Sequence, residues 1–531
     1  MSAKPPMSEG MRTGGLAGLA AFLCILAAIF GSRPDAAPVF AKLGTEFYPD
    51  FQDPLKATAL EVVEYDEAGA FARPFKVELA GGKWSIPSHS GYPADAKERL
   101  AKTASSVIGL KKDQLASETE KDHEALGVVD PLDGNVPGGK GRGKRVTFYS
   151  GGAALATFVF GKEAGEGKRY VRVPGEKQTW VSKTPGEVSA KFEDWVETDL
   201  LQLTAASLRR VVIDKYSFDE AELKIKDRVV NTLAREDGAK PWTVNEIKET
   251  EELNDSNVNA LVTTLDDLKI AGVRRKPPLV GKAKDLNELA TLPRQQVNAI
   301  AQDLAPRGFF VMTDGKTLQI VCNEGEMAAS CDDGVVYSLR FGEVIVGAGE
   351  QISAGGMDEK KDGKKDGAEH RFLFVSVRFD EALLGPPPVA PPEYKADPAK
   401  KPEDQQMDEA KAKAAKDDYE RKKKDHEQKI ADGKKRKEKL EARFAEWYYV
   451  ISGESFKKLR LDRAGLVKPK EKKEEGKPGE KHDEPSSAPK GGAPEGKPAP
   501  PKAPEGKPAE KAPEKKAEEK PAPAKPEEKK P

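Results

Sequence analysis

Glycine-rich segments are the first parts of this chain whose residue types could do chemistry. Residues 134–140 read Gly-Asn-Val-Pro-Gly-Gly-Lys and fit the first seven positions of a phosphate-binding loop. That loop needs Ser or Thr next, with a strand before it and a helix after it, whereas Gly141 follows here. Residues 347–349 resemble a dinucleotide fingerprint, but Ile352 stands where its third glycine belongs. We therefore interpret residues 134–140 as a flexible basic hairpin connection and reject both nucleotide motifs.

Two histidines have neighbours that invite a catalytic interpretation. His89 lies between Ser88 and Ser90, but a nucleophilic pair also needs hydrogen-bond geometry and an orienting acid. Adjacent side chains rarely supply these, so we interpret His89 as a turn residue. His123 and Glu124 lack the second histidine, one helical turn away, that a zinc protease needs. The sequence therefore predicts no catalytic, cofactor-binding or metal-binding residue, and no enzymatic activity.

Three cysteines, Cys24, Cys322 and Cys331, are too few for a disulfide-dense scaffold or a four-cysteine zinc site. Cys322 and Cys331 flank a predicted turn at residues 323–326. In an oxidising compartment they would form a disulfide, and the alternative is two buried free thiols. The sequence leaves both alternatives open.

The N-terminus carries an apolar run at residues 14–31, preceded by Lys4 and Arg12. As a helix this run of about 18 residues spans roughly 27 Å, close to the thickness of a bilayer core. Positive charge before the run favours a cytoplasmic N-terminus. We therefore expect a single-pass anchor in the inner membrane, with the bulk of the chain outside the cytoplasm. A cleaved signal peptide is the alternative. Nearly equal basic and acidic counts, 88 and 89, argue against a nucleic-acid partner.

The elements between the two ends show a weak internal repeat. Three strands and a helix are predicted in each half, about 150 residues apart, which suggests a tandem pair of modules. The helix of the first half covers about residues 95–110, and that of the second begins near Ser256. Trp84 and Trp242 lie at equivalent positions, where core packing is the first interpretation and a ligand platform the second. The predicted strands lie at residues 60–65, 75–79, 83–86, 208–214, 231–235 and 242–244.

Each half continues into a predicted antiparallel meander with glycine-rich turns. This pattern is typical of the α+β class. We therefore expect two related antiparallel β-β-β-α-plus-meander modules after one N-terminal transmembrane helix. The meander strands are expected at residues 144–149, 155–161, 169–173 and 179–183, and at residues 309–313, 318–322, 335–341 and 343–346.

A Pro-rich and charged excursion separates the second meander from its expected closing strand, residues 447–451. Residues 404–443 are almost all charged residues and alanine, which predicts a solvated helix, coiled coil or helical hairpin interrupted at Gly433. Residues 468–531 contain no Val, Ile, Leu, Met, Phe, Tyr, Trp or Cys. Such a segment cannot offset its ordering entropy, so we expect a disordered tail that serves as an inert spacer or, alternatively, as a tether.

These patterns divide the chain into seven expected segments. They are, in order, a cytoplasmic N-terminus (1–13), the anchor (14–31), a first module (43–200), a second module (201–379, with a charged insertion at 355–367), the excursion (380–443), a closing segment (444–467) and the tail (468–531).

Several of these elements also carry a family resemblance. The motifs Phe-Tyr-Pro-Asp-Phe at 47–51, Trp-Ser-Ile at 84–86, His-Glu-Ala-Leu-Gly-Val at 123–128, Tyr-Val-Arg at 170–172 and Trp-Tyr-Tyr-Val-Ile at 447–451 carry it, together with Gly161. The chain resembles the family called domain of unknown function 4340 over roughly residues 43–467. The resemblance implies a membrane-anchored extracytoplasmic protein associated with ABC-transporter or gliding-motility components. It implies no activity and no functional residue.

The expected function is therefore that of a non-enzymatic, membrane-anchored accessory or scaffold protein of an ABC-transporter or gliding-type envelope complex. An extracytoplasmic module that binds a ligand or polymer is the alternative, and a hydrolase is a more distant one. No cofactor is expected.

Overall fold

The computed structural model of the chain describes residues 20–22, 39–67, 70–134, 139–186, 188–282, 292–313, 318–355, 367–395 and 401–470. The described residues up to Lys470 belong to one compact unit. Within the described ranges, no helix combines the length and the apolar composition that crossing a bilayer requires. Most of the predicted anchor at residues 14–31, and the predicted tail beyond Lys470, lie outside the described residues.

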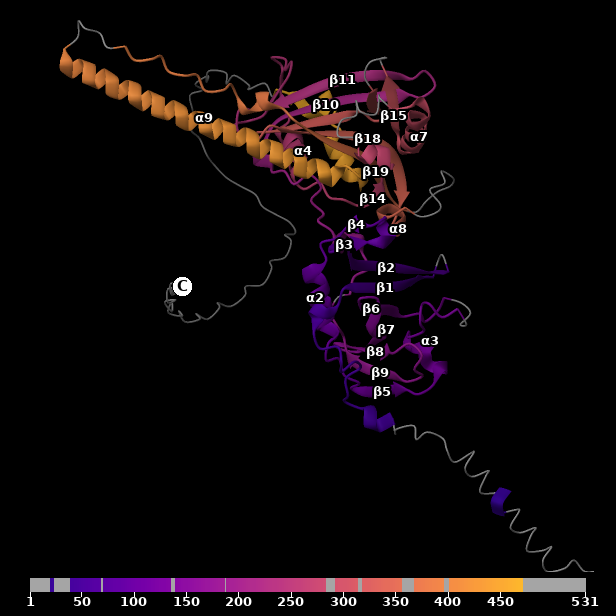
Figure 1. The fold of residues 1–531 in the computed structure, drawn as a ribbon. Coiled ribbons are helices and arrows are strands. Elements are labelled where there is room, and N and C mark those ends of the chain that lie inside the picture. Colours follow the sequence, from indigo (N-terminus) through magenta and orange to yellow (C-terminus); the bar gives the residue numbers. More distant parts are fainter. Residues whose placement is uncertain are drawn as a thin grey trace, which may run out of the picture. The chain divides into compact units, whose positions relative to one another are not determined.

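An antiparallel sheet organises the first half of the fold (Figure 1). Its strand order is β4-β3-β2-β1-β6-β7-β8-β9-β5. Helix α2 (Lys97–Val107) follows β4, and the short helix α3 (His123–Leu126) follows β5. The strands are β1 (Ala59–Asp66), β2 (Phe71–Ala80), β3 (Lys83–Ile86), β4 (Tyr92–Pro93), β5 (Gln114–Ser117), β6 (Lys144–Ser150), β7 (Ala153–Gly165), β8 (Lys168–Arg172) and β9 (Thr179–Lys183).

A second antiparallel sheet organises the second half, in the order β12-β11-β10-β17-β18-β19-β20-β14. Helix α4 (Asp255–Asp266) precedes β14 along the chain. The strands are β10 (Leu208–Asp219), β11 (Lys224–Ala234), β12 (Thr243–Val244), β14 (Gly272–Arg275), β17 (Glu326–Cys331), β18 (Val335–Gly347), β19 (Ala368–Phe379) and β20 (Trp447–Ser452).

The two sheets repeat one connectivity. Each begins with three consecutive antiparallel strands, β1–β3 in the first sheet and β10–β12 in the second, and the first sheet adds the two-residue strand β4. A helix follows, and the strand after that helix lies at the far edge of the sheet. There β5 pairs with β9, and β14 pairs with β20. The β-β-β-α order predicted from the sequence is therefore present twice. The paired strands of both sheets are antiparallel, which confirms the predicted α+β class.

Apolar faces at helical spacing hold the helices on the sheets. Helix α2 buries Leu100, Ala104 and Val107, which lie four and three residues apart on one face of the helix. Helix α4 buries Val258, Leu261, Val262 and Leu265, which share one hydrophobic core with residues of both sheets. Trp242 belongs to this core and Trp84 packs against it, in line with the core-packing interpretation of the two tryptophans.

The second meander differs from its prediction in three respects. Strand β17 lies between β10 and β18, although no strand is predicted there, because its Ala-rich sequence carries no strong β signal. Strands β15 (Phe309–Thr313) and β16 (Leu318–Cys322), which were predicted to belong to the meander, form a separate two-stranded sheet. The two expected strands at 335–341 and 343–346 are one strand, β18, with an irregular register between Phe341 and Val344.

The charged excursion contains a helix longer than the prediction allowed. Helix α9 runs unbroken from Pro402 to Phe444, so the predicted interruption at Gly433 is wrong. Strand β20 then pairs with both β19 and β14 inside the second sheet. This pairing confirms the predicted closing strand, and it makes the excursion an insertion between two neighbouring strands of one sheet.

The ordered chain also extends slightly further than the composition suggested. Strand β21 (Val467–Pro469) pairs with β13 (Glu251–Leu253), and Lys468 lies opposite Glu252. The Lys470 amide donates to the Thr250 carbonyl at 2.9 Å. The predicted start of the tail at residue 468 is therefore too early, because backbone pairing needs no apolar side chain.

Candidate functional site: the base of helix α9

Helix α9 has little to stabilise it along most of its length. Residues 403–432 are exposed or half-buried, and their sequence is mainly charged residues and alanine. Ion pairs one turn apart, such as Asp418 with Lys422, contribute only about 0.2–0.5 kcal/mol each. The helix must therefore be held mainly where it meets the second sheet, at a set of contacts from Gly433 to Phe444 that we call the α9 base.

Gly433 brings the α9 backbone directly onto the turn between β17 and β18. A Cβ atom built at Gly433 would lie 2.2 Å from the Asp333 carbonyl oxygen and 2.5 Å from the ring of Phe379. Real Cβ atoms essentially never approach other atoms this closely, so any larger residue at this position would force the turn or the helix to shift. The residue interpreted as a helix break is instead a point of close packing.

Arg436 ties the next turn of the helix to the same β17–β18 turn. Its guanidinium forms an ion pair with Asp333 and donates to the Gln202 carbonyl at 2.8 Å. It also donates to the Tyr337 hydroxyl at 3.3 Å. Because Asp333 is half-buried and the guanidinium has several partners, this pair is more restrained than a fully exposed surface pair.

The last turn of α9 is held by two further cations and an apolar anchor. Leu440 and Phe444 are buried in the main core. Arg443 donates to the Asp199 carbonyl at 2.7 Å. The Lys276 ammonium donates to the Phe444 carbonyl at 2.9 Å, which places a cation at the C-terminal, electronegative end of the helix.

Lys276 is the most unusual ionisable group in the α9 base. Its side chain is 6% exposed, and its Nζ lies 3.9 Å from the centre of the Phe374 ring. Burial, with a smaller contribution from the nearby Arg340, lowers the pKa of Lys276 to about 7. An amine donates a hydrogen bond in either protonation state, so the contact with Phe444 survives the loss of the proton, while the attraction of its charge for the helix end does not.

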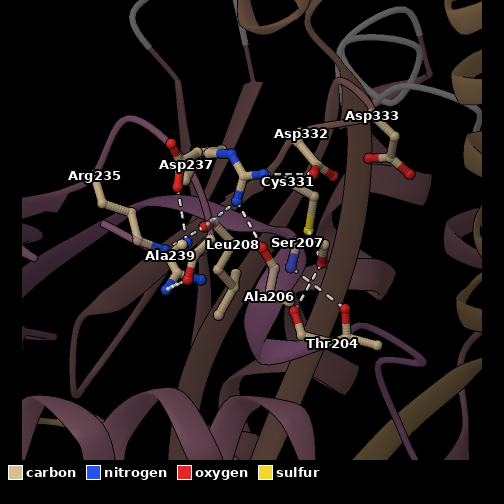
Figure 2. Close-up of polar contacts among 12 residues, drawn as sticks. Thr204, Ala206, Ser207, Leu208, Arg235, Asp237, Ala239, Cys331, Asp332 and Asp333 are labelled. Carbon is tan, nitrogen blue, oxygen red and sulfur yellow. Dashed lines mark hydrogen bonds and ion pairs between the residues drawn. The ribbon is translucent and has the colours of Figure 1, made fainter. Parts of the chain in front are cut away.

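A polar cluster beside the α9 base surrounds the start of β10 (Figure 2). Arg209 pairs with Asp332, the neighbour of Asp333, at 2.6 Å, and it donates to the Ala206 carbonyl. The Arg235 guanidinium donates to the carbonyls of Leu208 at 2.9 Å and Gly238 at 3.0 Å. These cations are occupied by backbone carbonyls, so the cluster joins the ends of β10, β11 and β17 and has the character of a structural clamp.

The two cysteines lie in different surroundings. Cys331 ends β17, accepts from the Ser207 hydroxyl at 3.7 Å, and has a pKa raised to about 11 by burial. Cys322 ends β16 and contacts the Tyr216 hydroxyl at 3.4 Å. Both are free and buried. Strand β17 runs between them and is about 17 Å long, beyond the reach of a disulfide, so the structure favours the free-thiol alternative.

His89 is buried and binds two serines. Its Nδ1 lies 2.9 Å from the Ser88 hydroxyl and its Nε2 lies 2.9 Å from Ser353, in helix α8 (Glu350–Ser353) of the second half. The ring stacks on Phe192. Burial, with a smaller contribution from Arg274, lowers the pKa of His89 to about 4. A neutral imidazole held by two hydroxyls is a link between the two halves of the fold rather than a general base oriented by an acid.

The other residues considered from the sequence lie apart from this link. His123 is in α3, where its Nε2 lies 2.8 Å from the Lys177 carbonyl oxygen, and Glu124 is exposed. Within the described ranges, no group of three or more His, Cys, Asp or Glu side chains is placed to hold a metal ion. Residues 135–138, the centre of the phosphate-loop-like segment, lie outside the described residues.

Comparison with known families bears on the first sheet and the start of the second. Residues 84–291 match the family model described as Domain of unknown function (DUF4340). The predicted family resemblance is confirmed. The match begins in β3 and ends after α4, so it spans parts of both sheets and stops before α9. The motifs at residues 47–51 and 447–451 lie outside it.

No curated protein and no solved structure matches the chain. The α9 base was not identified from the sequence either. Its one local signal was Gly433, a lone glycine in a long helical pattern, because such a glycine often marks close packing. The partners of Gly433, Arg436 and Lys276 are distant in sequence and become visible only in the fold.

Proposed function

We propose that this protein is a non-enzymatic scaffold or accessory protein, anchored in the inner membrane with its folded part outside the cytoplasm. Its partners would be components of an ABC-transporter or gliding-type envelope complex, the context implied by the family resemblance. The observation that carries the proposal is helix α9, a long charged helix mounted on a folded sheet through the α9 base.

A helix mounted on a folded sheet loses less conformational entropy when it binds a partner than a free chain does. The part of α9 before Gly433 is about 46 Å long as a helix, and its side chains are largely exposed. A free chain with this composition would lose conformational entropy on meeting a partner. Mounting the helix at one end removes much of that cost and sets its direction. A helix held in this way suits the task of positioning other proteins, and it requires no chemistry.

The test uses an arm-less variant that lacks residues 386–432 and carries a short Gly-Ser linker between Gly385 and Gly433. The α9 base is retained, so the variant is expected to keep its thermal unfolding midpoint within a few degrees. Expressed in a deletion strain, it should pellet with membranes and remain sensitive to protease added to spheroplasts. It should fail to restore the transport or motility phenotype that the full chain restores.

Two results would count against the proposal. Recovery of the full chain in the soluble fraction would contradict membrane anchoring. Full rescue by the arm-less variant, with loss of rescue on substituting a single polar residue such as His89, would favour an enzyme or a soluble binding protein.

A further inference from the structure

The segment that leads into α9 has its own enforced conformation. Residues 385–395 connect the turn η8 (Glu381–Leu384) to the region before α9, and their sequence is Gly-Pro-Pro-Pro-Val-Ala-Pro-Pro-Glu-Tyr-Lys. Each proline ring fixes φ near −65°, and each residue before a proline is excluded from the helical region. Within 386–392 only Val389 escapes both constraints. These constraints favour a polyproline II conformation, which would be about 20 Å long over seven residues.

One ridge of this polyproline helix faces the protein and the others face solvent. Pro388 and Pro391, three residues apart, are half-buried, as the period of three residues per turn requires. The next residue on that ridge, Tyr394, donates its hydroxyl to the Gln405 carbonyl of α9 at 3.1 Å. At the other end, Asp380 caps η8 by accepting from the Ala382 amide at 3.2 Å. The segment is thus held at both ends.

The solvent-facing ridge consists of Pro386, Val389 and Pro392, again at a spacing of three. The Val389 side chain is 89% exposed, more than any other large apolar side chain in the described part of the chain. Nothing in the fold requires a valine there. A rigid spacer would be served equally well by a polar residue, which would avoid exposing apolar surface.

Apolar side chains on a preformed polyproline helix are the ligand of one kind of protein surface, a groove lined with aromatic side chains. Such a ligand loses little conformational entropy on binding. In this chain both the prolines and the attachment of the segment to α9 restrict the conformations of the unbound segment, so less entropy is left to lose on binding. Glu393 is exposed at the end of the neighbouring ridge, where a basic residue of the partner would set the direction of binding.

We propose that residues 386–392 are a docking ridge for a partner protein that carries an aromatic-lined groove. This inference rests on the proposed scaffold function and specifies the chemistry of one of its partners. The ridge would supply apolar contacts through Pro386, Val389 and Pro392, and α9 would hold it away from the sheets.

The test places a photo-crosslinking amino acid at position 389 of the full-length protein in its native membranes, with position 413 on the exposed face of α9 as the matched control. A protein adduct is expected from position 389. A synthetic peptide of residues 385–395, added in excess, should reduce that adduct at least about fivefold. The same peptide with Pro386, Pro387 and Pro388 changed to alanine should not.

A second measurement uses the captured partner's purified extramembrane domain. Val389→Glu in the full chain should weaken its binding at least about tenfold, whereas Leu223→Glu, another exposed apolar position, should leave the affinity unchanged. Two results would overturn the docking-ridge proposal and leave the scaffold proposal in place. The first is an adduct from position 413 without one from position 389, and the second is an adduct from position 389 that the peptide does not reduce. Adducts from neither position, or only with a second copy of this chain, would count against both.

Discussion

Replacing Gly433 with alanine tests whether α9 is mounted as described, because two environments predict effects of opposite sign. In a solvated helix, Gly433→Ala would stabilise by about 1 kcal/mol through helix propensity alone. In the α9 base, the new Cβ would lie 2.2 Å from the Asp333 carbonyl and 2.5 Å from the Phe379 ring. Either the β17–β18 turn or the helix must shift by close to 1 Å.

Overpacking of this kind typically costs about 1–3 kcal/mol, and the closeness of a backbone carbonyl favours the upper part of that range. After the gain in propensity, the expected net result is a destabilisation of about 1–2 kcal/mol. Urea unfolding followed by tryptophan fluorescence measures this loss of stability. Amide exchange over residues 434–444 should also accelerate. Ala414→Gly, at an exposed position of the same helix, is the control and should leave the exchange of 434–444 unchanged. A stabilisation by Gly433→Ala would refute the close approach.

Three further outcomes follow from the buried groups and the chain end. The folded-state pKa of Lys276, about 7, lies below its ordinary 10.5, so the unfolded chain binds more protons between these two pH values. The free energy of unfolding should therefore rise by about 2 kcal/mol from pH 7 to 9. In urea unfolding at a series of pH values, Lys276→Met should remove this rise and the control Lys429→Met should retain it. The folded-state pKa of His89, about 4, lies below its ordinary 6.5, so the free energy of unfolding should fall by about 2 kcal/mol from pH 7 to 5. His89→Gln should make this dependence on pH weaker. If the variant shows the same dependence as the original protein, His89 is not buried as a neutral ring. Removing residues 471–531 should leave the unfolding midpoint within error, whereas removing residues 467–531 should lower it by breaking the pairing of β21 with β13; equal midpoints would contradict that pairing.

What could be predicted from the sequence depended on how local the signal was. The faces of α2 and α4, the tandem strand order and the closing strand β20 each follow from apolar spacing within one segment. Strand β17 was missed because its residues are small and weakly β-forming, and its place is set by its neighbours β10 and β18.

The α9 base and the docking ridge both depend on contacts between residues far apart in the sequence, which local patterns do not reveal. Gly433 looked like a break because, in sequence, a glycine among charged residues has no visible partner, and Asp333 lies far from it along the chain. The Pro-rich character of residues 386–392 was evident from composition. The orientation of its ridges, with Val389 outward, depends on the contact of Tyr394 with α9.

The central claim is that α9 and the segment before it position partner proteins. The most direct measurement is quantitative crosslinking and co-purification from native membranes, comparing the full chain with the variant that lacks residues 386–432 at equal expression. The account predicts that the full chain recovers a discrete envelope complex and that the arm-less variant, folded and still in the membrane fraction, loses it. Recovery of the same complex in the same yield by the arm-less variant would contradict the account.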